Sequence, residues 1–315
     1  MKTSPGIKAI ALIVSLLLLI PICKNWYSFL ARTFSDDNDT SVNPLEYKIL
    51  TDSTAAVSKC RLPEIENICI PEKVLINGND YTVTHIGNKS FSYCRKLTNI
   101  IIPESVTEIE YSAFSGCSSL TNIELPESVE SIGNFAFKGC SSLTNIEIPK
   151  NVTDIGKWAF MNCFSLANIE IPENITFIEI GTFYGCFHLT NIKIPESVTN
   201  IGNSAFYGCS HLTNIEIPTS VTNIGISTFQ NCSNLTNFEI PTSVTRIEEW
   251  AFSNCSKLRD IKIPASVTKI GDHAFDGCDK IDVVIDKTKN DIDIGYHAFL
   301  GCRSVSYAES GVRAR

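Results

Sequence analysis

Ten cysteines recur along the chain at an almost constant spacing of about 23 residues, and thiols in such a series could bind metal, form disulfides or act as nucleophiles. They are Cys94, Cys117, Cys140, Cys163, Cys186, Cys209, Cys232, Cys255, Cys278 and Cys302. If the repeats stack, neighbouring thiols lie within the Cα separation that a disulfide tolerates. Equivalent thiols in register are nevertheless typical of small apolar core residues. We therefore expect free, buried thiols here, and we leave open a disulfide between Cys60 and Cys69.

Two pairs of histidines are also spaced by about one repeat, namely His188 with His211 and His273 with His297. Two imidazoles alone make a weak metal site, because zinc sites in proteins usually use three or four protein ligands. We therefore expect surface histidines, no metal site and no cofactor. The sequence also shows no glycine-rich phosphate loop, no paired catalytic carboxylates and no Ser–His–Asp set. We accordingly predict that the protein is not an enzyme and has no catalytic residues.

The elements that position these residues follow the same period. Phe recurs at this interval from Phe91 to Phe275 and then one residue late at Phe299, and Pro recurs from Pro103 to Pro264. A fixed period of 20–50 residues indicates stacked repeats. Within each repeat, the pattern Leu-x-x-Ile-x-Ile predicts a short strand whose alternate side chains point inward, and Pro ends it. The pattern Val-x-x-Ile then predicts a second short strand.

The rest of each repeat must close the circuit. Gly follows the second strand in many repeats, as at Gly133 and Gly156, which predicts a turn with positive φ. Ala-Phe and Cys come next, and we expect a helical turn there. The sequence thus predicts a mainly β stack of about ten such coils, with short strands and helical turns.

The full pattern, L-x-x-I-x-I-P-x-x-V-x-x-I-G-x-x-A-F-x-x-C, resembles the BspA type of leucine-rich repeat over about residues 45–305. The resemblance implies a curved leucine-rich-repeat solenoid, often at a cell surface, with no catalysis and a role in adhesion to matrix proteins or to other cells. Glu110, Glu179 and Glu248 depart from the pattern at the Gly position, which leaves the geometry of those turns open.

The two ends of the repeat region differ from its middle. Residues 45–90 are predicted to form an amino-terminal cap with the first coil, because Asn77-Gly78 between apolar positions indicates a hairpin and a stack must cover the core at its end. Residues 91–305 are predicted to form the repeats. We expect a polar tether at 32–44 and a polar tail at 306–315.

Residues 1–31 are predicted to be a signal peptide or a signal-anchor. An apolar stretch at 9–22 follows Lys2 and Lys8, which is the pattern of an export signal. Extended from Ile7 to Cys23, this stretch just reaches the roughly 17–25 residues that a membrane span needs. We favour an uncleaved signal-anchor over a cleaved signal peptide, with a buried core helix as a third interpretation. The protein is then expected at the cell surface or secreted, with membrane attachment through this segment.

The outward positions of the first strand are candidates for contact with a partner. We call them the sheet row, and they are Ile101, Glu124, Glu147, Glu170, Lys193, Glu216, Glu239 and Lys262. Like charges on adjacent strands repel each other, so three successive Glu could mark a cationic or polar ligand. The other interpretation is a solvated face that prevents association. A parallel Asn column, Asn99 to Asn237 followed by Asp260, is expected to form a hydrogen-bonded ladder.

Trp158 and Trp250 share a position outside the predicted sheet and are candidates for either partner contact or edge packing. The net charge of −8 and the pI near 5.2 argue against a nucleic-acid partner, which would need a basic stripe. We predict a non-catalytic binding protein whose sheet face contacts a matrix or cell-surface protein. A polysaccharide-binding solenoid and an intracellular scaffold are the alternatives.

Overall fold

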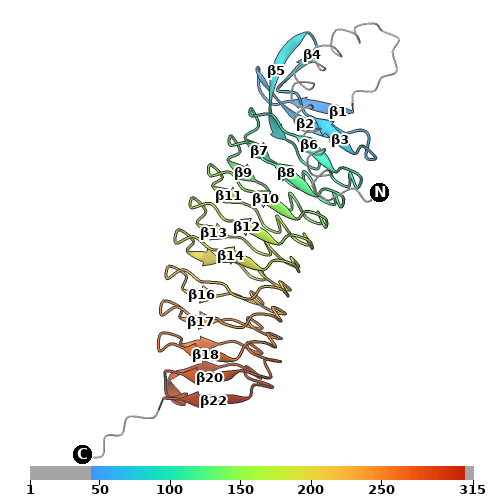
Figure 1. Cartoon of the computed structure of the whole chain (residues 1–315). Coiled ribbons are helices and arrows are strands. Elements are labelled where there is room, and N and C mark those ends of the chain that lie inside the picture. Colours follow the sequence, from blue (N-terminus) through green and yellow to red (C-terminus); the bar gives the residue numbers. More distant parts are fainter. Residues whose placement is uncertain (1–43, 309–315) are drawn as a thin grey trace, which may run out of the picture.

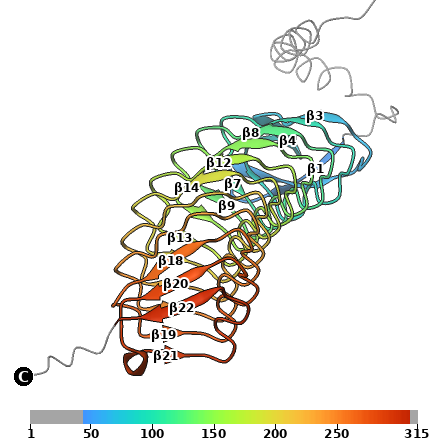
Figure 2. The same ribbon diagram turned by 60° about the horizontal axis from the view of Figure 1, so that its bottom comes forward.

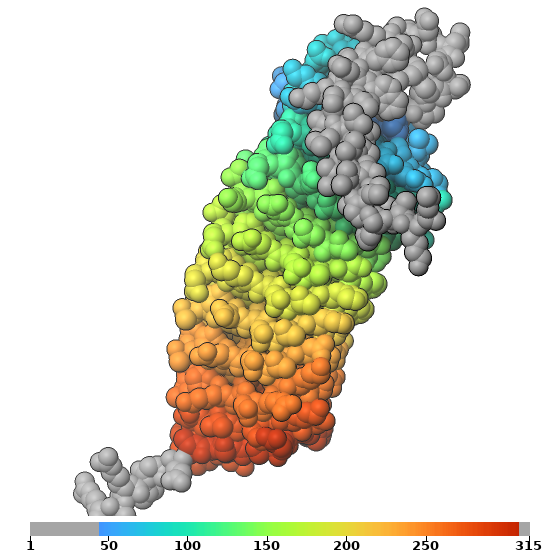
Figure 3. All heavy atoms as spheres, in the orientation of Figure 1, coloured from blue at the N-terminus to red at the C-terminus, as the bar shows by residue number. Residues whose placement is uncertain are grey.

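The structure is a computed structural model that describes residues 44–308, and it is an elongated stack of coils with a cap at its amino-terminal end (Figure 1). It is mainly β, which confirms the predicted leucine-rich-repeat solenoid. Seen more nearly end-on, each coil is a closed circuit (Figure 2). The space-filling view shows close-packed layers without a deep cleft on the visible side (Figure 3). The predicted signal segment lies outside the described residues, and residues 44–308 contain no helix long and apolar enough to cross a membrane.

The first strand of each coil lies beside its counterparts in parallel register, for example Asn145 beside Asn122. We call the surface formed by these strands the first-strand face. The series is β3 (Asn67–Cys69), β6 (Asn99–Ile101), β8 (Asn122–Glu124), β10 (Asn145–Glu147), β12 (Asn168–Glu170), β14 (Asn191–Lys193), β18 (Asp260–Ile263), β20 (Asp282–Ile285) and β22 (Ser304–Tyr307). Between β14 and β18 the ladder narrows to a single bridge between Asn214 and Asn237.

The second strands form a separate series on another side of the stack (Figure 2). They are β7 (Glu108–Ile109), β9 (Ser131–Ile132), β11 (Asp154–Ile155), β13 (Phe177–Ile178), β15 (Asn200–Ile201), β16 (Asn223–Ile224), β17 (Arg246–Ile247), β19 (Lys269–Ile270) and β21 (Asp293–Ile294). Each has only two residues, because the chain turns again directly after the inward Ile. The 3-10 helix η1 (Lys289–Asp291) lies in the last coil, where the spacing of the repeat slips by one residue.

The cap consists of two antiparallel pairs joined to the second-strand series. Strand β1 (Leu45–Ile49) pairs with β2 (Thr54–Cys60), and β4 (Lys73–Ile76) pairs with β5 (Asn79–Ile86). The β4–β5 turn has φ of 53° at Asn77 and 83° at Gly78, which confirms the predicted hairpin. The sheet order β1-β2-β5-β7-β9-β11 shows that β5 continues the second-strand series, so the cap covers the core of the first regular coil.

The core is built from columns of identical residues. The Phe side chains from Phe91 to Phe275 are fully buried and stack ring on ring, with centroid separations from 5.1 Å between Phe252 and Phe275 to 5.8 Å between Phe160 and Phe183. Burial of one such side chain is worth roughly 1.5–3 kcal/mol. From Phe114 to Phe275 each ring is covered by rings from both neighbouring coils, so a coil can bury its core only within the stack.

The segment that closes each coil is a run of turns, and the predicted helical turn is wrong. Between Gly133 and Cys140 the backbone N–H groups alternate in their bonding. Those of Ala136, Lys138 and Cys140 bond to the carbonyl three residues earlier, whereas those of Phe135, Phe137 and Gly139 bond to carbonyls of the next coil. Because half of the donors are used between coils, a continuous helix cannot form there.

The predicted reason for the Gly column is also wrong. Gly133 and Gly156 do not have positive φ; the left-handed conformation occurs two residues later, at Phe135 (59°) and Trp158 (59°). A Cβ placed on Gly156 would lie 2.5 Å from Asn134 N and 2.7 Å from Gly133 C. In coils such as that of Gly156, Gly is therefore used because the backbone of the preceding coil leaves no room for a Cβ, whereas the coils of Glu110, Glu179 and Glu248 accommodate a side chain at this position.

Candidate functional site

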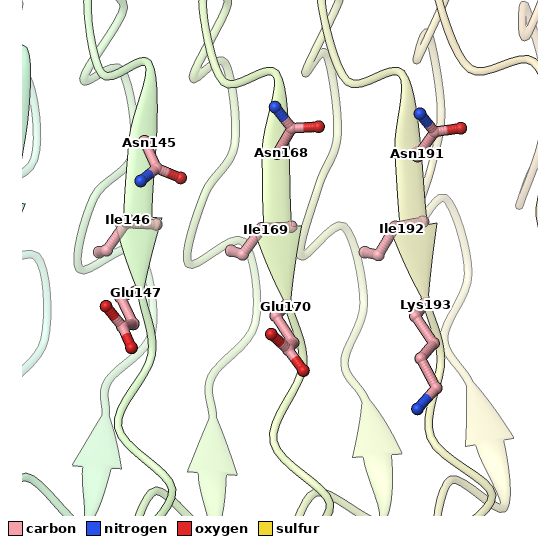
Figure 4. Close-up of a pocket in the computed structure, with 9 residues that line it drawn as sticks. All are labelled: Asn145, Ile146, Glu147, Asn168, Ile169, Glu170, Asn191, Ile192 and Lys193. Carbon is pink, nitrogen blue, oxygen red and sulfur yellow. The ribbon is translucent and has the colours of Figure 1, made fainter.

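The sheet row lies on the first-strand face as predicted from the strand alternation. All of its charged members are exposed, whereas Ile101, at the end nearest the cap, is half-buried. In the central three coils, Glu147, Glu170 and Lys193 form one line, and the Asn column forms a second line beside it (Figure 4). The inward Ile between each pair of outward side chains is buried in the core, so the strand fixes the direction of both rows.

The amino-terminal half of the sheet row is a strip of uncompensated negative charge. Glu124 and Glu147 are register partners on β8 and β10, and Glu170 follows on β12. Within residues 44–308, none of these three carboxylates forms an ion pair. Like charges directly opposite each other on adjacent strands are destabilising. The fold therefore holds three carboxylates together without neutralising them.

The basic members of the sheet row are compensated by residues outside it. Lys193 Nζ lies 3.5 Å from Glu173 Oε1, and Lys262 Nζ lies 2.9 Å from Asp286 Oδ2. Both ion pairs are largely exposed, so each contributes little to stability. They nevertheless reduce the positive charge next to Glu170 and Glu239, and the row as a whole stays acidic.

The Asn column forms its expected ladder only at its ends. Asn99 Nδ2 donates to Asn67 Oδ1 at 2.7 Å, and Asn237 Nδ2 donates to Asn214 Oδ1 at 3.5 Å. In the described structure, the side chains of Asn145, Asn168 and Asn191 make no hydrogen bond to one another. Their exposed amides therefore present both donors and acceptors to a ligand.

The two rows line shallow hollows. The first has a volume of about 430 Å³ and lies between β10, β12 and β14, lined by the Asn, Ile and Glu or Lys of each strand (Figure 4). The second, of about 420 Å³, lies farther along the same face and includes Phe238, Glu239, Lys262 and Val284. Carboxylates, amides and apolar side chains on a flat surface can bind an extended polar surface. The first hollow contains no thiol, hydroxyl or imidazole that would act as a nucleophile.

Trp158 and Trp250 do not lie on the first-strand face, because each follows a second strand. Both are half-buried, and their rings pack on neighbouring coils. Trp158 is tilted against Tyr184 with 5.5 Å between ring centroids, and Trp250 stacks on His273 at 4.0 Å. Both Trp therefore lie outside the first-strand face, where the sequence placed them, and their rings pack against neighbouring coils.

An exposed aromatic stack beside the first-strand face was missed in the sequence. Phe164 and Phe187 stack at 5.0 Å with 3° between ring planes, and they are 37% and 43% exposed. They stand where other coils have Ser, as at Ser141 and Ser210, so the departure from the repeat was the available signal. His188 and His211 stack at 4.9 Å and are exposed, as expected for surface histidines.

The cysteine series is buried except at Cys302, which is half-buried, and it carries no disulfide among the described residues. No disulfide joins Cys60 to Cys69, so the pairing that the sequence left open is not formed. Burial raises the pKa of thiols such as Cys163 well above its ordinary value. A neutral buried thiol is a poor nucleophile and a poor metal ligand. These cysteines therefore act as core residues.

A family model described as "BspA type Leucine rich repeat region" matches this sequence in six copies, over residues 65–188 and 176–306. Among solved structures, the chain is similar to a leucine-rich repeat protein from Bacteroides ovatus, with 28% identity, a TM-score of 0.54, and coverage of 85% of this chain and 91% of that one. It also matches a leucine rich cell surface protein from Faecalibacterium prausnitzii, with 25% identity, a TM-score of 0.41, and coverage of 88% and 97%. The pneumococcal vaccine antigen PcpA matches with 18% identity, a TM-score of 0.49, and coverage of 86% and 87%. A comparison with curated protein sequences found no match.

Proposed function

The chain belongs to the BspA-type leucine-rich repeat family, and from that premise we propose that it is a non-catalytic protein that binds a partner protein with a basic surface through its first-strand face. The observation that carries this proposal is the strip of Glu124, Glu147 and Glu170, which the fold holds in adjacent coils without an ion pair. Such a strip lowers stability, and a basic partner surface would offset that cost.

The shape of the face fits a protein partner better than a small molecule. Its hollows are shallow, and the sheet row and the Asn column run along many coils (Figure 4). Stable protein–protein interfaces bury roughly 800 Å² on each partner, which needs an extended surface of this kind. Lysine or arginine side chains of the partner would contact the carboxylates, and the free amides of Asn145 and Asn168 would hydrogen-bond to its backbone.

Display at the cell surface is part of the same proposal. It is supported by the family and by the apolar stretch at 9–22 that follows Lys2 and Lys8. A matrix or cell-surface protein is then the expected partner, and adhesion is the expected role. Protease treatment of intact cells tests the display, because the repeats should be cleaved while cytosolic proteins are protected. Repeats that stay intact would favour the intracellular scaffold instead.

The binding proposal is tested with two variants of the full chain that have the same change in net charge. The first replaces Glu147 and Glu170 with Lys on the first-strand face. The control replaces Glu130 and Glu249 with Lys; both residues are exposed and belong to the second-strand side. Binding is measured by surface plasmon resonance to purified extracellular matrix proteins and to a lysine-rich peptide.

We expect the first variant to lose at least tenfold in affinity for any matrix protein that the natural chain binds, and the control to retain its affinity. Binding of the natural chain should also weaken as NaCl rises, because salt screens exposed charges. Equal losses in both variants would show a general charge effect, and no loss in the first variant would exclude the strip as the site.

A second candidate ligand, a polysaccharide, is favoured by the Phe164–Phe187 stack. Its exposed rings lie just before β12 and β14, close along the chain to Asn168 and Asn191. Stacked rings beside free amides are the combination that a sugar chain would use. Replacing both Phe with Ser, the residue found in other coils, should abolish retention on a glycan array. The variant with Glu147 and Glu170 replaced should retain it.

A further inference from the structure

We propose that His85, Glu108 and Glu110 form a binding site for a Zn²⁺ ion at the junction between the cap and the first regular coil. One ligand atom from each of the three side chains lies within 4.8 Å of the other two. The site is separate from the first-strand face, and it goes beyond the proposed binding function. The sequence did not predict this site, because His85 and Glu110 are far apart along the chain and only the stacking of the coils brings them together.

The parallel pairing of β5 with β7 places the first two ligands side by side. His85 is the register partner of Glu108, and 3.4 Å separates His85 Nε2 from Glu108 Oε2. Zn²⁺ binds nitrogen and oxygen ligands at about 2.0–2.2 Å in a tetrahedron, which puts neighbouring ligand atoms about 3.3 Å apart. The observed separation therefore suits two ligands of one ion without rearrangement of the strands.

A β-bulge orients the imidazole. Along β2 the register advances by one residue, from Ala55 to Ala56, while along β5 it advances by two, from Val83 to His85. Thr84 is thus the extra residue, and a bulge re-aims the side chains beside it. As a result Thr84 Oγ1 lies 2.8 Å from His85 Nδ1, a contact between chain neighbours that a regular strand would place on opposite faces. Fixing Nδ1 in this way leaves Nε2 free for a metal, as in known zinc sites.

The third ligand, Glu110, stands at a position where the repeat usually has Gly. Glu110 occupies the Gly position of its coil, where most coils have no side chain. Its Oε2 accepts a hydrogen bond of 2.9 Å from the backbone N–H of Asn88. This bond holds one carboxylate oxygen and leaves the other available. Glu110 lies two residues after Glu108, so both carboxylates project from the same side of the chain.

The charge of the cluster favours a cation. Two carboxylates and one imidazole lie together, and no lysine or arginine within residues 44–308 forms an ion pair with either carboxylate. His85 and Glu110 are half-buried, whereas Glu108 is exposed. Three protein ligands with an open side match a zinc site completed by water, whereas Ca²⁺ takes six to eight oxygen ligands and Mg²⁺ usually keeps several waters. The bound ion would join the cap to the stack.

The test is calorimetric titration of the metal-free full chain with ZnCl₂. The variants are His85→Gln and Glu110→Gly, and the second restores the residue of the repeat, so its fold should be retained. The matched control is Glu179→Gly, which makes the same change in a coil where the carboxylate lies near Asp154 and not near an imidazole. The buried thiols are unchanged in all of these proteins. Circular dichroism checks that each variant is folded.

We expect one Zn²⁺ per chain, at least tenfold weaker binding in His85→Gln and Glu110→Gly, and unchanged binding in Glu179→Gly. Zinc should raise the thermal midpoint of the natural chain and of the control only. Absorption of the Co²⁺-loaded protein should show no thiolate charge-transfer band, because cysteines are not ligands. No stoichiometric binding, binding that survives Glu110→Gly, or equal binding of Ca²⁺ would each overturn the proposal.

Discussion

The thiol of Cys140 donates a hydrogen bond to the carbonyl oxygen of Phe114, 26 residues earlier, with 3.2 Å between Sγ and O. The same bond links Cys163 to Phe137 at 3.1 Å and recurs through the stack to Cys278. A thiol fits this position because it is small and apolar enough for the core and still has a weak donor for a backbone carbonyl. The cysteine series therefore ties each coil to its predecessor.

These buried thiols should make the protein sensitive to alkaline pH. Burial raises the pKa of Cys186 and of Cys232 to about 12, from an ordinary value of 9.0. Between these values the unfolded chain loses protons that the folded chain keeps, so stability falls as pH rises above about 9 and is unaffected below it. Each such thiol lowers the free energy of unfolding by about 1.4 kcal/mol per pH unit, once it is deprotonated in the unfolded chain and still protonated in the folded one.

We expect the thermal midpoint to be constant from about pH 7 to pH 8.5 and to fall steeply from about pH 9 to pH 10. Replacing Cys186 and Cys232 with Ala should lower the midpoint at neutral pH, because the replacements remove packed atoms and two hydrogen bonds, and should make the alkaline fall shallower. An equally steep fall in the variant would assign the effect to other groups.

Cys60 should be the most reactive of the described thiols. The Cys94 thiol donates a hydrogen bond to its sulfur and lowers the pKa of Cys60, whereas it is burial that raises the pKa of Cys163. The thiolate is the species that reacts, so N-ethylmaleimide at about pH 7.5 should modify Cys60 first. Peptide mass spectrometry gives the order of modification. Cys94→Ala should slow the reaction at Cys60, and equally fast labelling of Cys163 would contradict the assignment.

Gly156 should be hard to replace even though its φ is ordinary. A Cβ there would lie 2.5 Å from Asn134 N, so we expect Gly156→Ala to cost about 2 kcal/mol or more. The control is Gly139→Asn, since Gly139 has positive φ (72°) and Asn162 has φ of 59° at the same coil position. Urea midpoints followed by circular dichroism should shift markedly for the first variant and little for the second. An unchanged midpoint in Gly156→Ala would contradict the close-approach explanation for the Gly column.

The repulsion between the carboxylates of the sheet row should lower the stability of the protein by a measurable amount. Glu147 is the register partner of Glu124 and lies beside the coil of Glu170, so Glu147→Lys should raise the thermal midpoint in low salt. The gain should vanish in about 1 M NaCl, where exposed charges are screened within about 3 Å. Glu216→Lys is the control, because its neighbours in the row are Lys193 and Glu239 and the change should be near zero. A gain in stability together with a loss of partner binding would show that the strip is kept for recognition.

The sequence by itself determined the repeat, the inward and outward positions of each strand and the hairpin at Asn77-Gly78. This was possible because the constant period of the repeat places every equivalent residue in one column, and strand alternation then fixes its direction. The exposure of Glu147 and the burial of Phe160 both follow from that reasoning.

Only the tertiary structure decided the features that depend on contact between coils. The alternating backbone bonds that replace a helical turn before Cys140, and the close approach at Gly156, arise where one coil packs on the next. The packing of Trp158 on Tyr184 likewise depends on how one coil sits against the next. The meeting of His85 with Glu110 depends on a bulge in β5 that no local pattern records, because a register shift is defined only against the strand beside it.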